Sequence, residues 1–175
     1  MRRQSYRSIA DPYTAERGVV TESGTGDVRR ANADDSDQLL HLWAQLFDES
    51  GAASQGEWRN HALEWFATSV DDAAYARFPV IEVEGKLVST AIGTLELGVP
   101  NPQCVKGRTV RLANVITLPE HRGNGYATKL ARDVIDWARS IAADRVDLSA
   151  TPDGQRLYEE LGFVVTSATR MKLVL

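Results

Sequence analysis

The sequence predicts one domain of the α/β class, a mixed sheet of six to seven strands flanked by about four helices. From Val110 to Ala138, a buried strand leads through a short glycine-bearing loop into a long amphipathic helix. Between residues 78 and 97, two β-rich runs flank Gly85, as in a hairpin. The 175 residues suffice for one ordinary domain with a sizeable core.

The chain begins with a polar stretch, residues 1–26, that contains Pro12 and several glycines and shows no sustained periodicity. We expect an N-terminal extension there, poorly ordered or draped over the surface, and the domain proper at residues 27–175. A first strand is expected at Asp27–Ala31. Asn32 then caps a helix, and Asp35, three positions later, completes a variant of the capping box.

Two helices are expected before the hairpin. The first ends near residues 48–51 and carries an apolar face made of Leu39, Leu42, Trp43, Leu46 and Phe47. The second spans about residues 57–69, with Trp58, Ala62, Trp65 and Phe66 on one face. We interpret Trp58 and Trp65 as core residues. The hairpin strands follow at Phe78–Glu84 and Lys86–Leu97.

The second half of the chain continues the sheet. Arg145–Ala150 is expected as a strand parallel to the central one, because a strand–helix–parallel strand unit forms a right-handed crossover. A short helix at about residues 154–160 ends at Gly162, a residue type common just after a helix C-terminus. Phe163–Thr166 and Arg170–Leu175 are expected to complete the sheet as an antiparallel pair.

The loop before the long helix indicates an anion site. The run Arg122-Gly123-Asn124-Gly125 places backbone N–H groups at a helix N-terminus, where they bind phosphate well. A nucleoside-triphosphate loop would need a longer glycine-spaced run ending in Lys-Ser/Thr, which is absent. A dinucleotide fingerprint would need a third glycine, where Thr128 stands.

Two sequence motifs indicate which class of phosphate-bearing ligand to expect at this loop. The pattern Arg122-x-x-Gly125-x-Ala127, after Val115-x-x-x-Pro119-Glu120, resembles the acyl-CoA motif of the GNAT superfamily of N-acetyltransferases. The segment from Leu148 to Phe163, which ends in Leu157-Tyr158-x-x-x-Gly162-Phe163, resembles the later strand–helix motif of the same superfamily. The resemblance covers about residues 28–175 and implies the acyl-CoA N-acyltransferase fold, with acetyl-CoA as cosubstrate and no metal.

The resemblance also implies roles for individual residues. Backbone groups of Val115, Ile116 and Thr117 would meet the pantetheine arm and the thioester. The pyrophosphate would lie on the loop and the first helical turn, which comprise Arg122, Gly123, Asn124, Gly125, Tyr126, Ala127 and Thr128. Arg122 either supports the loop or reaches phosphate. Lys129 and Arg132 either bind the 3′-phosphate or form a solvated helix face. Thr151 stands where relatives often have an asparagine that contacts CoA.

Catalysis requires a proton for the leaving thiolate, and Tyr158, seven residues after Thr151, is the candidate general acid. Packing alone is the alternative role for its ring. No general base stands out. Relatives that carry a glutamate five residues before the asparagine have it where this chain has Val146. The remaining carboxylates and histidines are Asp48, Glu49, Glu57, Glu96, Asp147, His41, His61 and His121.

Composition and net charge exclude several classes of partner and site. The net charge of −4 and pI near 5.4 argue against nucleic-acid binding driven by phosphate neutralisation, and mild acidity fits cationic acceptors. The single Cys104 excludes an intramolecular disulfide. No apolar run approaches the length that spans a bilayer, and no signal peptide is evident, so a cytoplasmic protein is the default.

The sequence therefore predicts an acetyl-CoA-dependent N-acetyltransferase that acts on a primary amine, most simply of a small molecule. Two alternatives stay open: a catalytically silent acyl-CoA-binding or sensing domain, and an acetyltransferase acting on a protein amine. The sequence decides neither the acceptor, the general base, the acyl chain length, the role of residues 1–26 nor the oligomeric state, and a homodimer is left open.

Overall fold

The computed structural model describes residues 26–47, 56–167 and 171–174. The expected N-terminal extension, apart from Gly26, lies outside the described residues, as do the expected end of the first helix near residues 48–51 and part of the last expected strand.

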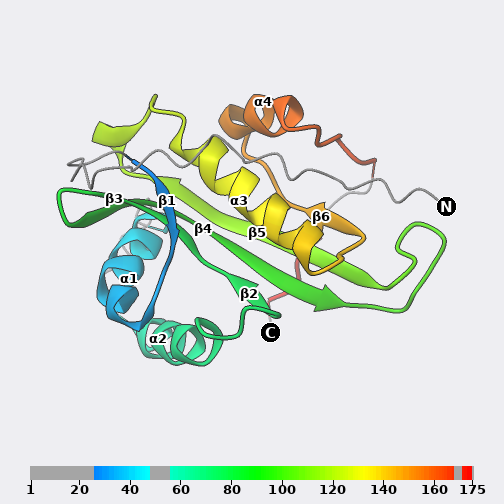
Figure 1. Cartoon of the computed structure of the whole chain (residues 1–175), viewed down its shortest axis with the longest axis horizontal. Coiled ribbons are helices and arrows are strands. Elements are labelled where there is room, and N and C mark those ends of the chain that lie inside the picture. The colour runs from blue at the N-terminus through cyan, green and yellow to red at the C-terminus, as the bar shows by residue number, and fades with distance from the viewer. Residues whose placement is uncertain (1–25, 48–55, 168–170, 175) are drawn as a thin grey trace, which may run out of the picture.

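Six strands form one mixed sheet (Figure 1). They are β1 (Val28–Arg30), β2 (Ala76–Arg77), β3 (Pro79–Val83), β4 (Lys86–Leu97), β5 (Arg108–Thr117) and β6 (Arg145–Asp147). The order is β1-β3-β4-β5-β6, and β2 pairs with the far end of β4. All pairs are antiparallel except β5 with β6, which are parallel. The helix between β5 and β6 makes the crossover that the sequence predicts.

Four α-helices cover the two faces of the sheet. They are α1 (Ser36–Gln45), α2 (Trp58–Ser69), α3 (Tyr126–Ser140) and α4 (Pro152–Glu160). Helices α1 and α2 lie on one face, and α3 lies on the other, with α4 beyond it (Figure 1). Short 3-10 turns precede α1 at Ala33–Asp35 and α3 at Pro119–His121. The predicted α/β class, the sheet of six to seven strands and the four helices are confirmed.

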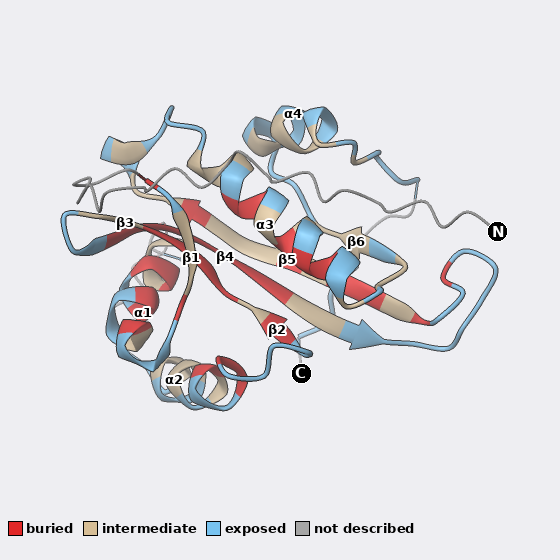
Figure 2. Cartoon of the chain, in the orientation of Figure 1, coloured by how far each residue is buried: buried red, intermediate tan, exposed pale blue. Residues whose placement is uncertain are grey.

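The core is divided by the sheet into two halves, and buried residues line β3, β4 and β5 and the inner sides of α1, α2 and α3 (Figure 2). Strand alternation distributes them, since Val80 packs towards α1 and α2 while Ile81 packs towards α3. Trp58 and Trp65 pack against the first half, as the sequence indicates. Helix α3 approaches β4 closely at Gly93, where a Cβ atom would lie 2.7 Å from a methyl group of Val134.

The structure corrects several expected boundaries. The short strand β2 is absent from the sequence prediction, and β6 ends at Asp147 rather than at Ala150. Helix α4 begins two residues earlier than expected, at Pro152, because the Thr151 hydroxyl accepts a hydrogen bond from the Gly154 amide (3.2 Å) and caps the helix.

The expected final antiparallel pair is wrong for the described residues, since Phe163–Thr166 and residues 171–174 form no strand. The chain turns at Gly162 (φ +94°) and leaves the sheet, so that Val164 and Val165 are largely exposed. Strand propensity needs a neighbouring strand to become a strand, and this segment has none within the described chain.

The 3-10 turn that leads into α1 starts with the capping box that the sequence predicts. Asn32 accepts a hydrogen bond from the Asp34 amide (2.8 Å), and its own amide donates to the Asp35 carboxylate (2.8 Å). The buried Asp35 also receives two hydrogen bonds from Arg29 of β1 (2.7 and 2.8 Å). The Arg29 guanidinium is the main cause that lowers the pKa of Asp35. One carboxylate thus joins β1 to the first helix.

We predict that Asp35→Asn lowers the free energy of unfolding by about 2 kcal/mol at pH 7, because charge-assisted hydrogen bonds to a buried group are lost. The folded-state pKa lies below the unfolded one, so this stability is present above about pH 4 and disappears as pH falls through the folded pKa. Urea titrations at pH 7 and pH 3 measure it. The exposed Asp34→Asn is the control, and an equal loss at both pH values would contradict the prediction.

The ends of α3 and α4 share one hydrogen-bond pattern but differ in residue type. At α4, the amides of Gly162 and Phe163 donate to the carbonyls of Glu159 and Tyr158 (both 3.0 Å). At α3, the amides of Ala142 and Ala143 donate to Arg139 and Ala138 in the same way (3.0 and 2.9 Å). Ala142 therefore adopts φ +55°, a conformation that alanine disfavours.

We predict that Ala142→Gly raises the free energy of unfolding by about 0.5–1 kcal/mol, since the left-handed position no longer strains a Cβ atom. Gly162→Ala, the matched change at α4, should lower it by about 1 kcal/mol. Thermal melts of both variants check the pair of signs. A destabilised Ala142→Gly protein would show that glycine's freedom in the unfolded chain outweighs the strain.

Candidate functional site

An unpaired edge on the central strand is the main feature of the site. The parallel ladder joins Thr109, Val110 and Arg111 to Arg145, Val146 and Asp147 and goes no further. β5 continues to Thr117, still paired with β4 on its other side. Within the described chain, no strand pairs with the β6 side of residues 112–117. Their outward backbone groups are therefore available to an extended ligand.

A β-bulge near the end of β5 changes the side of the sheet that the following residues face. Asn114 and Val115 together stand opposite Ala91, and Asn114 has φ +49°. The extra residue reverses the alternation, so Val110 and Leu112 pack towards α3 whereas Ile116 packs towards α1 and α2. The sequence prediction missed the bulge. Its signal is an asparagine, a residue that tolerates left-handed backbone, in the middle of an apolar strand.

Val115, Ile116 and Thr117, which are predicted to contact the pantetheine arm through their backbone, turn their backbone groups to different sides of β5. Leu118 donates to the Val88 carbonyl (2.9 Å), and Ser89 Oγ donates to the Ile116 carbonyl (2.8 Å), so Ile116 and Leu118 turn their backbone groups towards β4. Thr117 then turns its own to the other side, because neighbouring residues in a strand alternate. Val115 precedes Ile116 within the bulge. Thr117 and, by the same alternation, Val115 therefore turn their backbone groups to the unpaired side of β5, whereas Ile116 does not.

The glycine loop continues from this edge into α3. Gly123 and Gly125 adopt φ +81° and φ +72°, and Asn124 Nδ2 donates to the His121 carbonyl (2.9 Å). The first intrahelical bond runs from the Lys129 amide to Gly125 (3.1 Å). The amides of Tyr126, Ala127 and Thr128 therefore precede the helical ladder. Residues 122–125 are exposed and leave this helix end open to an anion.

Arg122 contacts the backbone of the loop. Its Nε donates to the Thr117 carbonyl (3.2 Å), which fastens the loop to the end of β5. This contact corresponds to loop support, one of the two roles that the sequence leaves open for Arg122. The other guanidinium nitrogens have no partner among the described residues, so the same side chain remains able to donate to a phosphate.

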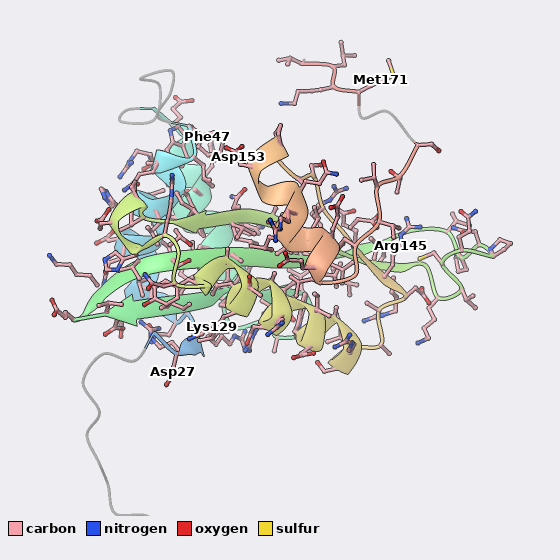
Figure 3. The ribbon with its side chains drawn as sticks, turned by 90° about the horizontal axis from the view of Figure 1, so that it is seen from above. Asp27, Phe47, Lys129, Arg145, Asp153 and Met171 are labelled. Carbon is pink, nitrogen blue, oxygen red and sulfur yellow. The ribbon has the colours of Figure 1, made fainter. Side chains whose placement is uncertain are left out.

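The exposed Lys129 contacts the residue that precedes Asp27 and the ring of Tyr126. Its ammonium donates to the Gly26 carbonyl (3.0 Å) and lies 5.7 Å from the centre of the Tyr126 ring. Gly26 in turn packs on Tyr126, where a Cβ atom would come within 2.6 Å of the ring. Figure 3 shows Lys129 on the side of the molecule where Asp27 lies. Gly26 thus covers one side of the first turn of α3.

Tyr158 of α4 packs on the same side of the sheet as α3. It belongs, with Val115 and Tyr126, to the apolar groups that surround the α3 half of the core. Its ring meets Phe163 edge to face at 5.8 Å, and burial raises the pKa of its hydroxyl. The described residues offer this hydroxyl no hydrogen bond. A protonated hydroxyl without a partner among the described residues is therefore held at the margin of the α3 half of the core.

None of the described acidic candidates stands out as a base. Glu96 pairs with Arg111 (3.2 Å) and lies opposite Thr109, about 25 Å along β5 from Thr117. Asp147 pairs with Arg145 (3.2 Å), and Glu57 is exposed just before α2. Asp48 and Glu49 lie outside the described residues. His41 and His61 are exposed, and His121 is half-buried before the loop.

No group of three or more His, Cys, Asp or Glu side chains in the described parts gathers as a metal site. None of the described helices is both long and apolar enough to cross a membrane.

Comparisons with known proteins agree with this geometry. A sequence model of the acetyltransferase (GNAT) family matches residues 38–163. No curated protein matches the chain significantly. Among solved structures, a predicted acetyltransferase from Clostridium acetobutylicum with acetyl-CoA is similar at a TM-score of 0.74 and 20% identity, over 84% of this chain and 95% of that one.

Two further similar structures are of enzymes whose names specify a substrate. Glucosamine-6-phosphate N-acetyltransferase from Arabidopsis thaliana has a TM-score of 0.69 and 19% identity, over 84% of this chain and 97% of that one. An aminoglycoside N-acetyltransferase in complex with CoA has a TM-score of 0.70 and 18% identity, over 89% and 99%. At these identities the structures show a shared fold. Since the family model spans most of the chain, from α1 through the glycine loop to Phe163, this chain belongs to the acetyltransferase (GNAT) family.

Proposed function

We propose that this chain transfers an acetyl group from acetyl-CoA to a primary amine of a small molecule. One observation carries the proposal: the unpaired edge of β5 runs directly into the amide-lined loop at the start of α3. An extended pantetheine arm that ends in a pyrophosphate has matching chemistry, because the arm carries amides and the other end carries negative charge.

The loop would hold the phosphate end of the cosubstrate. The amides of Tyr126, Ala127 and Thr128 precede the helical ladder, and Gly123 and Gly125 lie where a Cβ atom would meet nothing within 4 Å. The backbone there leaves room for phosphate oxygens, and the helix dipole favours them. Arg122 would add a charge-assisted hydrogen bond. The Thr151 hydroxyl caps α4, so a contact with CoA would be additional to that role.

The strand edge would hold the reacting end. A backbone N–H of Val115 or Thr117 would stabilise the oxyanion when the amine nitrogen attacks the thioester carbonyl. The C–N bond forms, the C–S bond breaks, and the CoA thiolate takes a proton from the Tyr158 hydroxyl. Because burial raises the pKa of Tyr158, its hydroxyl stays protonated near neutral pH and can donate this proton. The amine loses its own proton to water.

The small-molecule acceptor is supported by two observations. The two similar structures named above are of enzymes whose names specify amino sugars as acceptors, and one structure of such an enzyme contains a bisubstrate analogue of CoA and neamine. The net charge of −4 favours a cationic amine. A screen that measures thiol release from acetyl-CoA over amino sugars, polyamines, amino acids and peptides tests the class. Turnover of peptides alone would redirect the proposal to protein amines.

A silent acyl-CoA-binding domain is the second candidate function, and it is favoured by the lack of a placed general base among the described residues. Calorimetry separates the two. Binding of CoA without thiol release across the whole panel would support the silent domain, and release with any amine would exclude it.

We predict that Tyr158→Phe lowers kcat by about 100-fold or more while the Kd for CoA changes little, because the hydroxyl acts only as the thiolate leaves. Single-turnover thiol release against pH measures it. Tyr75→Phe, an exposed tyrosine before β2, is the control. Unchanged rates in Tyr158→Phe across the pH range would remove Tyr158 from the mechanism.

We predict that Gly125→Ala weakens CoA binding by about tenfold, because alanine at φ +72° distorts the loop that presents the amides. Gly85→Ala is the matched control, with φ +76° in the hairpin between β3 and β4 and equally open surroundings. Both variants should lose similar stability, and only Gly125→Ala should lose affinity in calorimetry. Equal affinities would argue against a phosphate cradle at this loop.

A further inference from the structure

Two hydroxyl groups meet at the open end of β5, next to its unpaired edge. Ser89 of β4 lies directly opposite Thr117 of β5, and their side-chain oxygens are 2.7 Å apart. Ser89 is fully buried, whereas Thr117 is half-buried. On its other side, Ser89 lies opposite Ile81 of β3, which packs in the α3 half of the core. Since residues directly opposite one another in a sheet share a face, both hydroxyls lie on the α3 side, as Tyr158 does.

The hydrogen atoms of this pair have one arrangement that satisfies both contacts. Ser89 Oγ lies 2.8 Å from the Ile116 carbonyl, which can only accept, so the single hydroxyl hydrogen of Ser89 is used there. The contact between the two hydroxyls then requires Thr117 to donate to Ser89. No described residue donates to Thr117 Oγ1. This oxygen therefore offers only acceptor lone pairs to a ligand.

The main chain and the side chain of Thr117 are both held in place. Its carbonyl accepts from Arg122 Nε (3.2 Å), and its hydroxyl donates to Ser89. Burial of Ser89 strengthens these hydrogen bonds, and a hydroxyl that donates becomes a better acceptor. The chain of hydrogen bonds ends at the Ile116 carbonyl, which does not exchange a proton near neutral pH. The pair is therefore suited to hold an N–H group and not to conduct a proton.

We propose that Thr117 Oγ1 accepts a hydrogen bond from an N–H group of the molecule that occupies the gap beside β5. Ser89 is then the positioning residue that keeps this oxygen an acceptor. These roles rest on the proposed function, which supplies two kinds of N–H group. One kind belongs to the amides of the pantetheine arm, and the other belongs to the acceptor amine. Both kinds are donors, as the acceptor-only oxygen of Thr117 requires.

The two sources of the N–H group differ in what the loss of the hydroxyl changes. An amide N–H is present in CoA itself, so loss of its partner weakens the binding of CoA. An amine N–H is absent from CoA, and its hydrogen bond strengthens as the attacking nitrogen gains positive charge. Loss of that bond leaves the Kd for CoA unchanged and lowers kcat/KM for the amine.

Thr117→Val tests the proposal, because valine has nearly the same shape and Ser89 can still donate to Ile116. The variant should lose about tenfold either in CoA affinity by calorimetry or in kcat/KM for the amine that the wild type turns over fastest. Thr117→Ser, which restores a hydroxyl, should recover most of that loss. Thr109→Val is the matched control, since Thr109 is a buried threonine of β5 in the part that β6 pairs.

Ser89→Ala tests the positioning role. Without Ser89, the Thr117 hydroxyl is free to rotate, so the same quantity should fall by about threefold. In the Thr117→Val background, Ser89→Ala should cause no further loss, because the oxygen that it positions is gone. A purely structural role of Ser89 would instead give the same loss in both backgrounds. Circular dichroism and thermal melts establish that each variant is folded.

The outcomes separate this proposal from the proposed function. If the wild type binds CoA and releases thiol while Thr117→Val matches it in both measurements, the role of Thr117 is overturned and the proposed function stands. If the wild type binds CoA but turns over no amine, the CoA titration of Thr117→Val decides alone. A wild type that does not bind CoA would overturn both proposals. An equal loss in Thr109→Val would show that the effect is not specific to the open end of β5.

Discussion

The parallel ladder between β5 and β6 ends at Arg111 and Asp147, and the candidate site follows from that ending. Beyond it, β5 keeps one neighbour, β4, and presents backbone donors and acceptors on its other side. The bulge at Asn114 then selects which of them face the gap. Recognition through the main chain depends little on side chains, so the apolar residues of β5 are free to fill the core.

The helix that completes the site is held by packing on the same strands. Gly93 lets α3 approach β4, while Arg77 and Asp133 form an ion pair (2.7 Å) that joins β2 to α3. The indole of Trp137 donates to the Ala73 carbonyl (2.8 Å). These contacts determine where the helix begins and thus where its free amides lie relative to the end of β5. The unpaired edge of β5 and the glycine loop at the start of α3 therefore follow one another along the chain.

Local chemistry made much of the fold predictable. The capping pair Asn32 and Asp35, the turn at Gly85 and the end of α4 at Gly162 each depend on residues adjacent in sequence, and each is found in the structure. The glycine loop before α3 was predictable as well, because its signal also lies in residues adjacent in sequence. Strand β2 was missed because it is only two residues long and exists through its partner on β4. The expected C-terminal strands are wrong for the opposite reason, since their described residues favour strands but find no neighbouring strand in the described part of the chain.

The sequence by itself determined the class of the fold and the glycine loop at the start of α3, and it singled out Tyr158 as a candidate, because glycine spacing, periodicity and residue type are local properties. Only the tertiary structure decided that Thr117 rather than Ile116 faces the gap, that Arg122 fastens the loop to β5, and that Glu96 lies far from the open end of the strand. Each of these depends on register and on the bulge, which place residues that are distant in the chain side by side.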